Sequence, residues 1–453
     1  MSTTTNIVWF RNDLRVENNA TLQHAIEHSK ALEAVYILPK KSDLLLGEAA
    51  KWYLHKSLIH LESSLYKLGI TLNFYLGDAD KILKNKIHDY GDRACVFSTQ
   101  SFNPIQIKID NKVNQSLPND QQLQYIGQDM IISPLEVKNS SGGFYKIYTP
   151  FANKFKKQLK NYPYQPIQKI QKTQLKPTKK TTKVGDLKLL DKYNWYQKFE
   201  NYWSPGERNA KIIFEKFIHH KIMHYTDKRN NLDEPYTSKL SASINFGEIS
   251  IAQMYFQINQ HFCNTNNSCE VSVYEFLDQL IWREFAKYSL YYQAESYLKS
   301  INRYCDSSTL WNGKDMLFEL WKKSKTGIDI IDSAMAQLWE EGWMHNRARM
   351  FAASFLTKNL GIHWTKGANW FWNTLVDADL AANTMGWQWV SGTAPYSAQF
   401  TRVFNPLIQA KKFDKKGLYI KKYLTARTQI APIVSIKDSS QAAKLRYEKI
   451  KKH

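Results

Sequence analysis

The sequence predicts two domains of different class: an amino-terminal α/β domain built on a parallel sheet, and a larger all-helical carboxyl-terminal domain. Three observations lead to this prediction. Up to about residue 130, short apolar strand patterns alternate with helical patterns, which is typical of a parallel sheet wound with helices. From about residue 195 onwards, apolar residues recur only at helical spacing. The 453 residues also exceed the size of a single hydrophobic core.

The amino-terminal elements follow one another in a regular order. Residues 6–10 form the first predicted strand, 19–29 a helix and 33–38 a second strand. Apolar side chains at three- and four-residue spacing then predict a long helix from about residue 52, which Gly69 ends. The remaining predicted strands are 70–76, 94–98 and 123–126. Neither common glycine-rich phosphate motif accompanies these strands, so the sheet pattern alone indicates no function.

The domain boundaries follow from a change of composition. Residues 137–185 contain no Asp or Glu and many Lys, Gln, Pro and Thr, so they have little apolar surface to bury. We therefore predict an α/β domain over 1–135, an exposed basic connector over 136–194, and a helical domain over 195–453. A basic arm that contacts DNA is the alternative interpretation of the connector.

The charge of the chain favours a polyanionic partner. The formal net charge is +21 and the pI is about 9.5. Basic side chains gain affinity for phosphates through counterion release, but a lysine-rich genome would raise the charge without any such function. Aromatic residues and arginines are interleaved between residues 282 and 402, and this favours a nucleic acid.

Other classes of protein are disfavoured by the sequence. No run of eighteen apolar residues predicts a membrane span, and the first residues lack the pattern of a secretory signal. We therefore expect a cytoplasmic protein that does not bind a membrane. The four cysteines form no CxxC motif, so isolated thiols are expected, although Cys263 and Cys269 are close enough in sequence to pair.

Most of the fourteen tryptophans lie between Trp282 and Trp389. Ordinary cores use Leu, Ile and Val, because an indole is hard to bury completely and its N–H needs a partner. This density indicates aromatic surfaces used for stacking or electron transfer. Within it, helical spacing places Trp343, Asn346 and Met350 on one face, which suits a flat heteroaromatic ligand or, alternatively, ordinary helix packing.

Two further motifs carry charge. Asp377 and Asp379 form a DxD pair, which could bind a metal, cap a helix or pair with an arginine; without a third ligand we expect no metal, and Arg349 is the candidate partner. In the GWQW segment, Trp387 and Trp389 alternate with other residues, a pattern compatible with an extended segment. From Tyr225 through Arg229 to TSKLS (237–241), hydroxyls surround a lysine, a combination that suits a pyrophosphate.

Taken together, these motifs resemble the DNA photolyase/cryptochrome family, most closely its class I cyclobutane pyrimidine dimer photolyases. The resemblance extends over most of the chain. It rests on WFRNDLR (9–15), TSKLS (237–241), IWREF (281–285), TGIDIIDSAMAQL (326–338), GWMHNRARM (342–350), DADLAAN (377–383), GWQW (386–389), RVFNP (402–406) and KKFDKKGLYI (411–420). The family's Rossmann-like domain and helical flavin domain agree with the predicted fold.

The resemblance implies a site for FAD. Lys239 stands where the family usually has Arg, and a point charge replaces the planar fork there with some loss of geometry. Asn383 falls where a side chain approaches flavin N5, and an amide there favours repair over signalling. The implied FAD-binding residues are Tyr225, Thr237, Ser238, Lys239, Leu240, Ser241, Arg283, Asn346, Arg349, Asp377, Asp379 and Asn383.

The resemblance also implies an electron path and a lesion pocket. Trp387, Trp364 and Trp311 match the three tryptophans that carry an electron from the surface to the flavin; together with Asn383 and Gln279 they are the implied catalytic residues. Gln279 stands where the class usually has a Glu that contacts the dimer, which predicts reduced efficiency. The implied DNA and lesion contacts are Arg229, Gln279, Trp282, Asn346, Arg347, Met350, Trp389 and Arg402.

The expected activity is that of a deoxyribodipyrimidine photo-lyase, in which light drives an electron from reduced FAD into a cyclobutane dimer of UV-damaged DNA. A sensory cryptochrome without repair and a (6-4) photolyase, suggested by Gln279, are the alternatives. The antenna stays open between a folate, a deazaflavin or lumazine, and none: the usual folate contacts fall at Asn103, Tyr297 and Leu298, which do not match. We expect a monomer.

Overall fold

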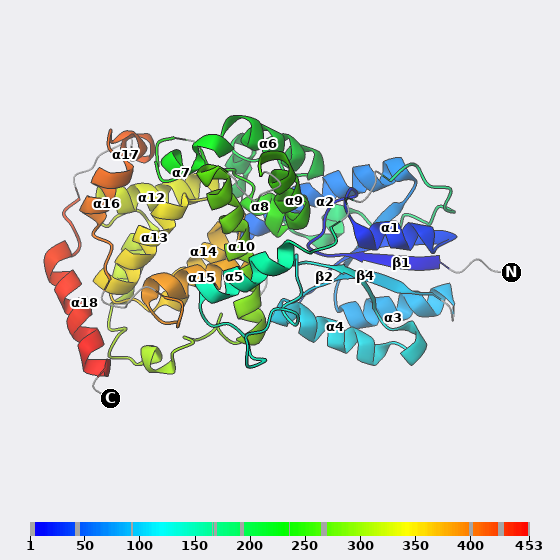
Figure 1. Cartoon of the computed structure of the whole chain (residues 1–453), viewed down its shortest axis with the longest axis horizontal. Coiled ribbons are helices and arrows are strands. Elements are labelled where there is room, and N and C mark those ends of the chain that lie inside the picture. The colour runs from blue at the N-terminus through cyan, green and yellow to red at the C-terminus, as the bar shows by residue number, and fades with distance from the viewer. Residues whose placement is uncertain are drawn as a thin grey trace.

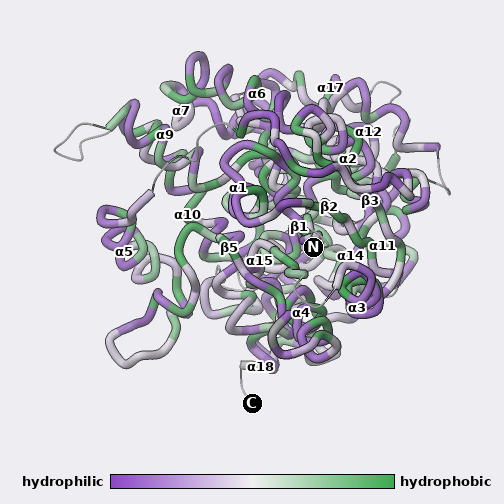
Figure 2. The backbone as a smooth tube through the Cα atoms, turned by 90° about the vertical axis from the view of Figure 1, so that its right-hand side faces the viewer, coloured by the Kyte–Doolittle hydropathy of each residue, from purple (hydrophilic) through white to green (hydrophobic). Residues whose placement is uncertain are grey.

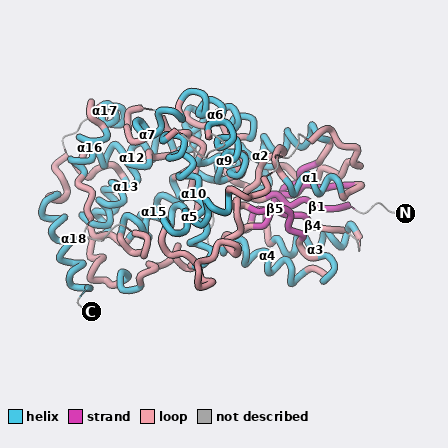
Figure 3. Tube along the Cα trace, viewed as in Figure 1, coloured by secondary structure: helices cyan, strands magenta, loops and turns pink. Residues whose placement is uncertain are grey.

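A parallel sheet occupies one end of the molecule and helices make up the rest (Figures 1 and 3). The computed structural model describes residues 5–40, 46–91, 94–164, 166, 170–190, 194–234, 236–263, 270–397, 402–424 and 430–451. The predicted α/β domain followed by a larger helical domain is therefore confirmed.

The sheet has five parallel strands in the order β3-β2-β1-β4-β5. All five strands were predicted to within two or three residues. Register places Trp9 opposite Val35, and Val8 opposite Phe97. Fully buried Val, Ile and Phe side chains on both faces explain why these strands appear as continuous apolar runs. The strands are β1 (Thr5–Phe10), β2 (Ala31–Leu38), β3 (Thr71–Leu76), β4 (Val96–Gln100) and β5 (Gln124–Gln128).

Helices cover both faces of the sheet (Figure 2). On one side lie α1 (Ala20–Glu27) and α2 (Glu48–Leu68), and on the other α3 (Ala79–Tyr90) and α4 (Pro104–Ser116). Gly69 ends α2 in the left-handed conformation with φ 83°, as the sequence predicted. The strand order reverses between β1 and β4, so their carboxyl ends form the topological switch point where α/β sheets offer a crevice.

The segment after β1 joins the sheet to the helical domain. The Asn12 side chain donates a hydrogen bond to the Asn245 carbonyl, and the Arg15 guanidinium donates one to the Gly247 carbonyl. A Cβ at Gly247, where φ is +69°, would lie 1.9 Å from the Asn12 carbonyl oxygen, so only glycine allows this approach. Asn245 in turn donates to the Ala378 carbonyl, inside the DxD motif.

Parts of the predicted connector, where the structure describes them, pack against the two domains. It contains α5 (Tyr148–Leu159), whose Phe151 and Phe155 are fully buried in the helical domain's core. Further along, residues 173–182 follow the edge strand β3: Asn73 donates to the Lys179 carbonyl and accepts from the Thr181 backbone. The segment therefore covers a sheet edge, which would otherwise leave unpaired backbone groups.

The helical domain surrounds α10, with the last helix, α18, at the far end of the molecule from the sheet (Figure 1). Its helices are α6 (Glu207–His220), α7 (Tyr225–Lys228), α8 (Ser241–Asn245), α9 (Ile251–Phe262), α10 (Val271–Tyr292), α11 (Asp315–Lys322), α12 (Asp329–Glu341), α13 (Asn346–Ser354), α14 (Trp364–Thr374), α15 (Leu380–Ser391), α16 (Pro406–Phe413), α17 (Leu418–Tyr423) and α18 (Ile436–Lys451). Short 3₁₀ segments are η1 (Asn119–Gln121), η2 (Val184–Leu187), η3 (Trp195–Asn201), η4 (Ile222–His224) and η5 (Arg303–Asp306), and η6 (Phe355–Asn359) is a π-helix after α13.

Three expectations need correction or comment. GWQW is helical within α15 rather than extended. Trp387 is buried and Trp389 only half-buried, because residues two apart on a helix face different directions. Cys95 and Cys305 are reduced thiols, whereas Cys263 is disulfide-bonded, contrary to the expectation of isolated thiols. Within the described residues, none of the helices has the length and apolar character that crossing a membrane requires.

Candidate functional site

The centre of the candidate site is the ion pair between Arg349 of α13 and Asp377, which precedes α15. One guanidinium nitrogen of Arg349 lies 2.7 and 3.0 Å from the two carboxylate oxygens of Asp377. Arg349 Nε also donates to the Met344 carbonyl at 2.8 Å, which fixes the plane of the guanidinium. The predicted pairing is thus confirmed, and the pair ties the two helices together at the site.

Asp379 has a different role from Asp377. Its carboxylate accepts a hydrogen bond from the Ala382 backbone and so caps α15, and it lies 3.6 Å from the Arg283 guanidinium of α10. Beyond this cap, Ala382 and Gly386 are exposed one turn apart, and a Cβ at Gly386 would meet nothing within 4 Å. One face of α15 therefore borders open space between arginine and amide side chains.

Asn383 lies on the border of that face. Its side-chain amide donates a hydrogen bond of 3.0 Å to the Ala368 carbonyl of α14. Because the nitrogen is used in this way, the side-chain oxygen is the atom left to accept a hydrogen bond.

The TSKLS segment leads into α8, which begins at Ser241. Leu240 is fully buried, while Thr237 and Ser238 are half-buried and Ser241 is exposed. Lys239 adopts a left-handed φ of 57°, and its ammonium lies 3.0 Å from Glu341 and 3.6 Å from the centre of the Trp343 ring. Burial lowers the pKa of Lys239 despite the nearby carboxylate. The lysine is therefore held by Glu341, a partner that the sequence did not indicate.

The three tryptophans of the predicted electron path differ in burial. Trp387 and Trp364 are buried, with exposed fractions of 2% and 0%, whereas Trp311 is only half-buried. The Trp364 indole N–H donates to Ser300 Oγ at 3.0 Å, and that of Trp311 donates to the Cys305 carbonyl at 2.7 Å. Of the three indoles, only that of Trp311 is partly exposed to solvent.

Two half-buried indoles each stack on a neighbouring aromatic ring. Tyr148 of α5 stacks on Trp282 with ring centres 3.5 Å apart and an angle of 8°. Phe404 stacks on Trp389 at 6.2 Å and 23°. Gln279 lies one turn before Trp282 on α10 and shares its side of the helix.

Arginines form a rim near these indoles. Arg347 donates to the Asn230 side chain at 2.7 Å and lies over the Phe413 ring, and Arg402 lies over Phe404. Both arginines line a second cavity of 460 Å³, beside α16. Arg229, by contrast, pairs with Glu275 at 3.1 Å. On α13, Asn346 is exposed and Met350 half-buried, and the Arg347 guanidinium lies 3.6 Å from the Met350 sulfur.

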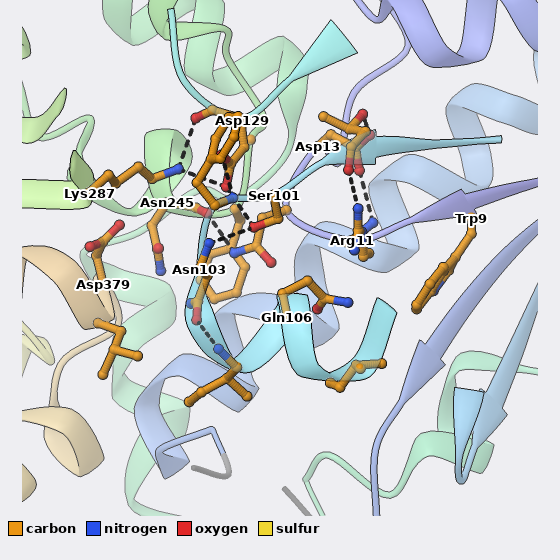
Figure 4. A pocket seen from close by; sticks show the side chains of 18 of the residues that line it. Trp9, Arg11, Asp13, Ser101, Asn103, Gln106, Asp129, Asn245, Lys287 and Asp379 are labelled. Atoms are coloured by element: carbon orange, nitrogen blue, oxygen red, sulfur yellow. Dashed lines mark hydrogen bonds and ion pairs between the residues drawn. The ribbon is translucent and has the colours of Figure 1, made fainter. Parts of the chain in front are cut away.

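A cavity of 540 Å³ lies between the sheet and the helical domain (Figure 4). Its wall includes residues that follow β1 and β4, at the topological switch point, and Asp379 and Arg283 on the opposite side. Arg11 pairs with the buried Asp110 at 2.7 Å, and Lys287 pairs with Asp129 at 3.0 Å. The buried Trp9 lines the cavity with an indole N–H that has no hydrogen-bond partner in the described structure.

Comparisons with known proteins agree with this arrangement. The family model for DNA photolyase matches residues 6–172, and the model for the FAD binding domain of DNA photolyase matches residues 276–450. The deoxyribodipyrimidine photo-lyase of Agrobacterium fabrum is 35% identical over 92% of this chain and 86% of that protein. The chain belongs to the DNA photolyase/cryptochrome family.

Photolyases and cryptochromes both occur among the relatives. Cryptochrome-1 of Arabidopsis thaliana is 28% identical over 92% of this chain, which covers 62% of that longer protein. A bacterial class III photolyase from Agrobacterium tumefaciens superimposes with a TM-score of 0.90, at 32% identity, over 100% of this chain and 99% of that one. A Synechocystis cryptochrome at 21% identity, with a TM-score of 0.84 over 98% of each chain, shares the fold. The class I resemblance is thus not supported over class III.

Within this family the chain carries an FAD-binding domain, and the donor set fits FAD. The open face of α15 lies beside the Arg349–Asp377 pair, Asn383 and Arg283, so charged and amide groups border a space suited to a flat heteroaromatic ring. The structure brings most predicted residues together on α10, α13 and α15 and the segment before α8. Arg229 lies at the edge, paired with Glu275.

Several residues at the site were missed from the sequence. Tyr148 lies in the segment taken as a connector, although its aromatic-rich neighbourhood FYKIYTPF was a usable signal. Glu284 is fully buried and accepts a hydrogen bond from the Ile131 backbone, and burial raises its pKa to about 7. His345 is also buried, which lowers its pKa to about 4. Periodicity does not distinguish such buried ionisable groups from exposed ones.

Proposed function

We propose that this protein is a deoxyribodipyrimidine photo-lyase that splits cyclobutane pyrimidine dimers in DNA. The observation that carries the proposal is the pair of half-buried indoles, Trp282 and Trp389, which stack on Tyr148 and Phe404 respectively. The other faces are the surfaces on which two pyrimidines, turned out of the duplex, would stack. Asn346 then reads their polar edges, and Met350 contacts their apolar parts.

Reduced FAD, when bound, supplies the light-driven one-electron chemistry that opens the cyclobutane ring. The chain's own residues hold and orient the cofactor. Arg349 and Asp377 place opposite charges beside the ring, and the Asn383 oxygen accepts a hydrogen bond from a ring N–H. Tyr225, Thr237, Ser238, Leu240 and Ser241 line the cradle for the rest of the cofactor, with Lys239 held beside it by Glu341.

Trp387, Trp364 and Trp311 carry an electron inwards when the cofactor must first be reduced. The partial exposure of Trp311 supports this direction, since this ring is accessible to an external reductant, whereas Trp364 and Trp387 are buried. Gln279 takes the place of an acidic contact to the dimer. It donates and accepts hydrogen bonds but cannot share a proton, so repair proceeds with reduced efficiency.

The basic rim supplies most of the affinity for DNA. Arg347 and Arg402 lie beside the second cavity, and the net charge of +21 adds long-range attraction. The protein acts as a monomer in the cytoplasm. Raising the salt from 50 to 200 mM should weaken binding by at least about tenfold, because phosphate contacts release counterions.

The 540 Å³ cavity supports an antenna chromophore as a second ligand. The cavity lies at the switch point of the sheet, and the Arg11–Asp110 and Lys287–Asp129 ion pairs, at 2.7 and 3.0 Å, hold its wall in place. The Trp9 indole N–H, which has no partner in the described structure, is available to donate a hydrogen bond to a ligand. A planar heteroaromatic, of folate or deazaflavin and lumazine type, fits these groups. The fluorescence spectrum of the chromophores extracted from the purified protein identifies the antenna. Trp9→Phe should lower the amount of bound antenna without changing the amount of bound FAD.

The deciding experiment illuminates the FAD-loaded, reduced protein with two oligonucleotides, one carrying a cyclobutane thymine dimer and one a (6-4) product, each with a dark control. We expect light-dependent repair of the cyclobutane substrate alone. Repair of the (6-4) product would instead assign the specificity to Gln279. Repair of neither would favour a sensory cryptochrome, as the cryptochrome relatives suggest.

A further inference from the structure

An unbroken set of contacts joins the two outer tryptophans of the electron path to one carboxylate. The Trp364 N–H donates to Ser300 Oγ at 3.0 Å. The backbone N–H of Ser300 then donates to both carboxylate oxygens of Asp306, at 3.2 and 3.1 Å. Asp306 is the last residue of η5 and directly follows Cys305, whose carbonyl accepts from the Trp311 indole. Asp306 is thus linked to Trp364 through Ser300 and to Trp311 through Cys305.

His363 lies between the same two indoles. Its ring centre is 4.8 Å from that of Trp311 and 5.9 Å from that of Trp364, at angles of 64° and 29°. Its Nε2 lies 3.4 Å from Asp306. Its Nδ1 accepts a hydrogen bond from the Thr365 backbone, at the start of α14. Nδ1 is therefore the acceptor, and the proton of the neutral ring is on Nε2, facing the carboxylate.

The charged groups that act on His363 are Asp306 of η5 and Lys366 of its own helix. Burial lowers the pKa of His363 below its ordinary 6.5, Asp306 raises it and Lys366 lowers it further. Lys366 is itself paired with the exposed Asp315. At neutral pH the imidazole is uncharged, so the His363–Asp306 pair carries one net negative charge.

We propose that the His363–Asp306 pair is an electrostatic element of the electron path, which stabilises the positive charge that forms on Trp364 and then on Trp311. The proposal rests on the proposed electron path. When an electron leaves Trp364 inwards, the indole becomes a cation radical, and an electron from Trp311 then moves the positive charge outwards. An external thiol finally gives one electron to Trp311 and releases its own proton.

The geometry explains both steps of this outward movement. The acceptor of the Trp311 N–H is a backbone carbonyl, which cannot take the proton, so a neighbouring negative charge stabilises the cation radical on this indole. Asp306 is the carboxylate that contacts the chain of hydrogen bonds from Trp364 and the imidazole against Trp311. Protonation of His363 would cancel the negative charge of Asp306, so a lower pH should oppose the outward movement of positive charge.

The test is the rate at which blue light reduces FAD in the purified holoprotein, in the presence of a thiol and as a function of pH. Asp306→Asn should slow this reduction about tenfold at pH 8, because a unit charge close to the indoles is lost. Asp89→Asn removes a comparable carboxylate from an exposed site in the sheet domain, where the side chain is 73% exposed, and should leave the rate unchanged.

His363→Gln provides a second variant if Asp306→Asn folds poorly. The wild type should lose rate as the pH falls through the lowered pKa of His363, whereas the variant should keep its rate, because Asp306 stays and no imidazolium cancels its charge. Transient absorption should show a shorter lifetime for the tryptophan cation radical in Asp306→Asn. Nitrogen chemical shifts of labelled histidine in the dark should show the Nε2–H tautomer of His363, a readout that does not depend on activity.

The outcomes separate this proposal from the proposed function. Trp387→Phe should abolish photoreduction; if it does not, the electron path itself is wrong. If Trp387→Phe abolishes photoreduction but Asp306→Asn, with normal FAD content, reduces at the wild-type rate at every pH, the electrostatic role of the pair is wrong. Chemically reduced Asp306→Asn should repair at the wild-type rate, and impaired repair there would show structural damage instead of a role in electron transfer.

Discussion

Gly367 of α14 lies directly against the Trp387 indole of α15. A Cβ at position 367 would be 2.1 Å from Cη2 of that indole and 2.6 Å from a methyl group of Leu356. The position has ordinary helical φ, so the requirement for glycine comes from this contact and not from the backbone. Gly367 lies three residues after Trp364 on the same helix, and it therefore sets how closely Trp387 approaches the helix that carries the next tryptophan of the path.

Gly367→Ala should destabilise the protein and disturb the electron path together. Overpacking a rigid core costs about 1–3 kcal/mol, because neither ring can move without displacing its neighbours. Urea unfolding should show this loss, and photoreduction of FAD should slow. Gly185→Ala is the matched control, since a Cβ there meets nothing within 4 Å. Unchanged stability of Gly367→Ala would mean that Trp387 is free to move.

Asp377→Asn should weaken retention of FAD. The substitution leaves the Arg349 guanidinium without the carboxylate that lies 2.7 Å away, and breaking such a pair leaves a half-buried charge unbalanced. The ratio of flavin to protein after gel filtration should fall several-fold. Asp78→Asn, which removes an exposed surface pair with Lys81, should retain the wild-type ratio. Full FAD occupancy in Asp377→Asn would remove this pair from the proposed cofactor site.

The elements that the sequence predicted correctly are those whose cause lies in a short stretch of neighbouring residues. The buried strands around Trp9 and Val35 are continuous apolar runs, and Gly69 marks a helix end because it alone tolerates φ 83°. The Arg349–Asp377 ion pair could be predicted because the two residues belong to sequence motifs of opposite charge. In each case the local sequence contains the physical cause of the structure.

The remaining features depend on contacts between distant segments. Lys239 pairs with Glu341, and Tyr148 stacks on Trp282, although more than a hundred residues separate the partners in sequence. Local periodicity cannot predict such contacts. The predicted connector covers β3 because an edge strand needs hydrogen-bond partners, whatever the composition of the segment that supplies them. GWQW is helical because α15 continues through it, and alternation over four residues could not decide between helix and strand.

Trp389→Ala should weaken binding of dimer-containing DNA and leave bound FAD intact. Stacking of a base on an aromatic ring contributes about 1–3 kcal/mol, so affinity for the damaged oligonucleotide should fall between about fivefold and a hundredfold. Titration in the dark measures this directly. Trp339→Ala, on the outer face of α12 where the ring is 44% exposed, is the control and should bind normally. Loss of FAD from Trp389→Ala would place this indole in the cofactor site instead.

His345 should make α13 sensitive to acid. Its Nδ1 accepts from the Arg347 backbone and caps the helix that carries Asn346 and Arg349, while its other ring nitrogen contacts the Arg229 carbonyl. Burial lowers the pKa of His345 to about 4 from 6.5, so the folded protein disfavours the proton. Stability from this group is therefore complete above pH 6.5 and is lost as the pH falls towards 4, by an amount on the order of 3 kcal/mol.

Asn is also a helix-capping residue, so His345→Asn should keep the cap and lose this part of the pH dependence. Urea unfolding of both proteins at pH 7 and pH 5 measures the difference, and identical pH dependence would mean that His345 does not titrate with folding.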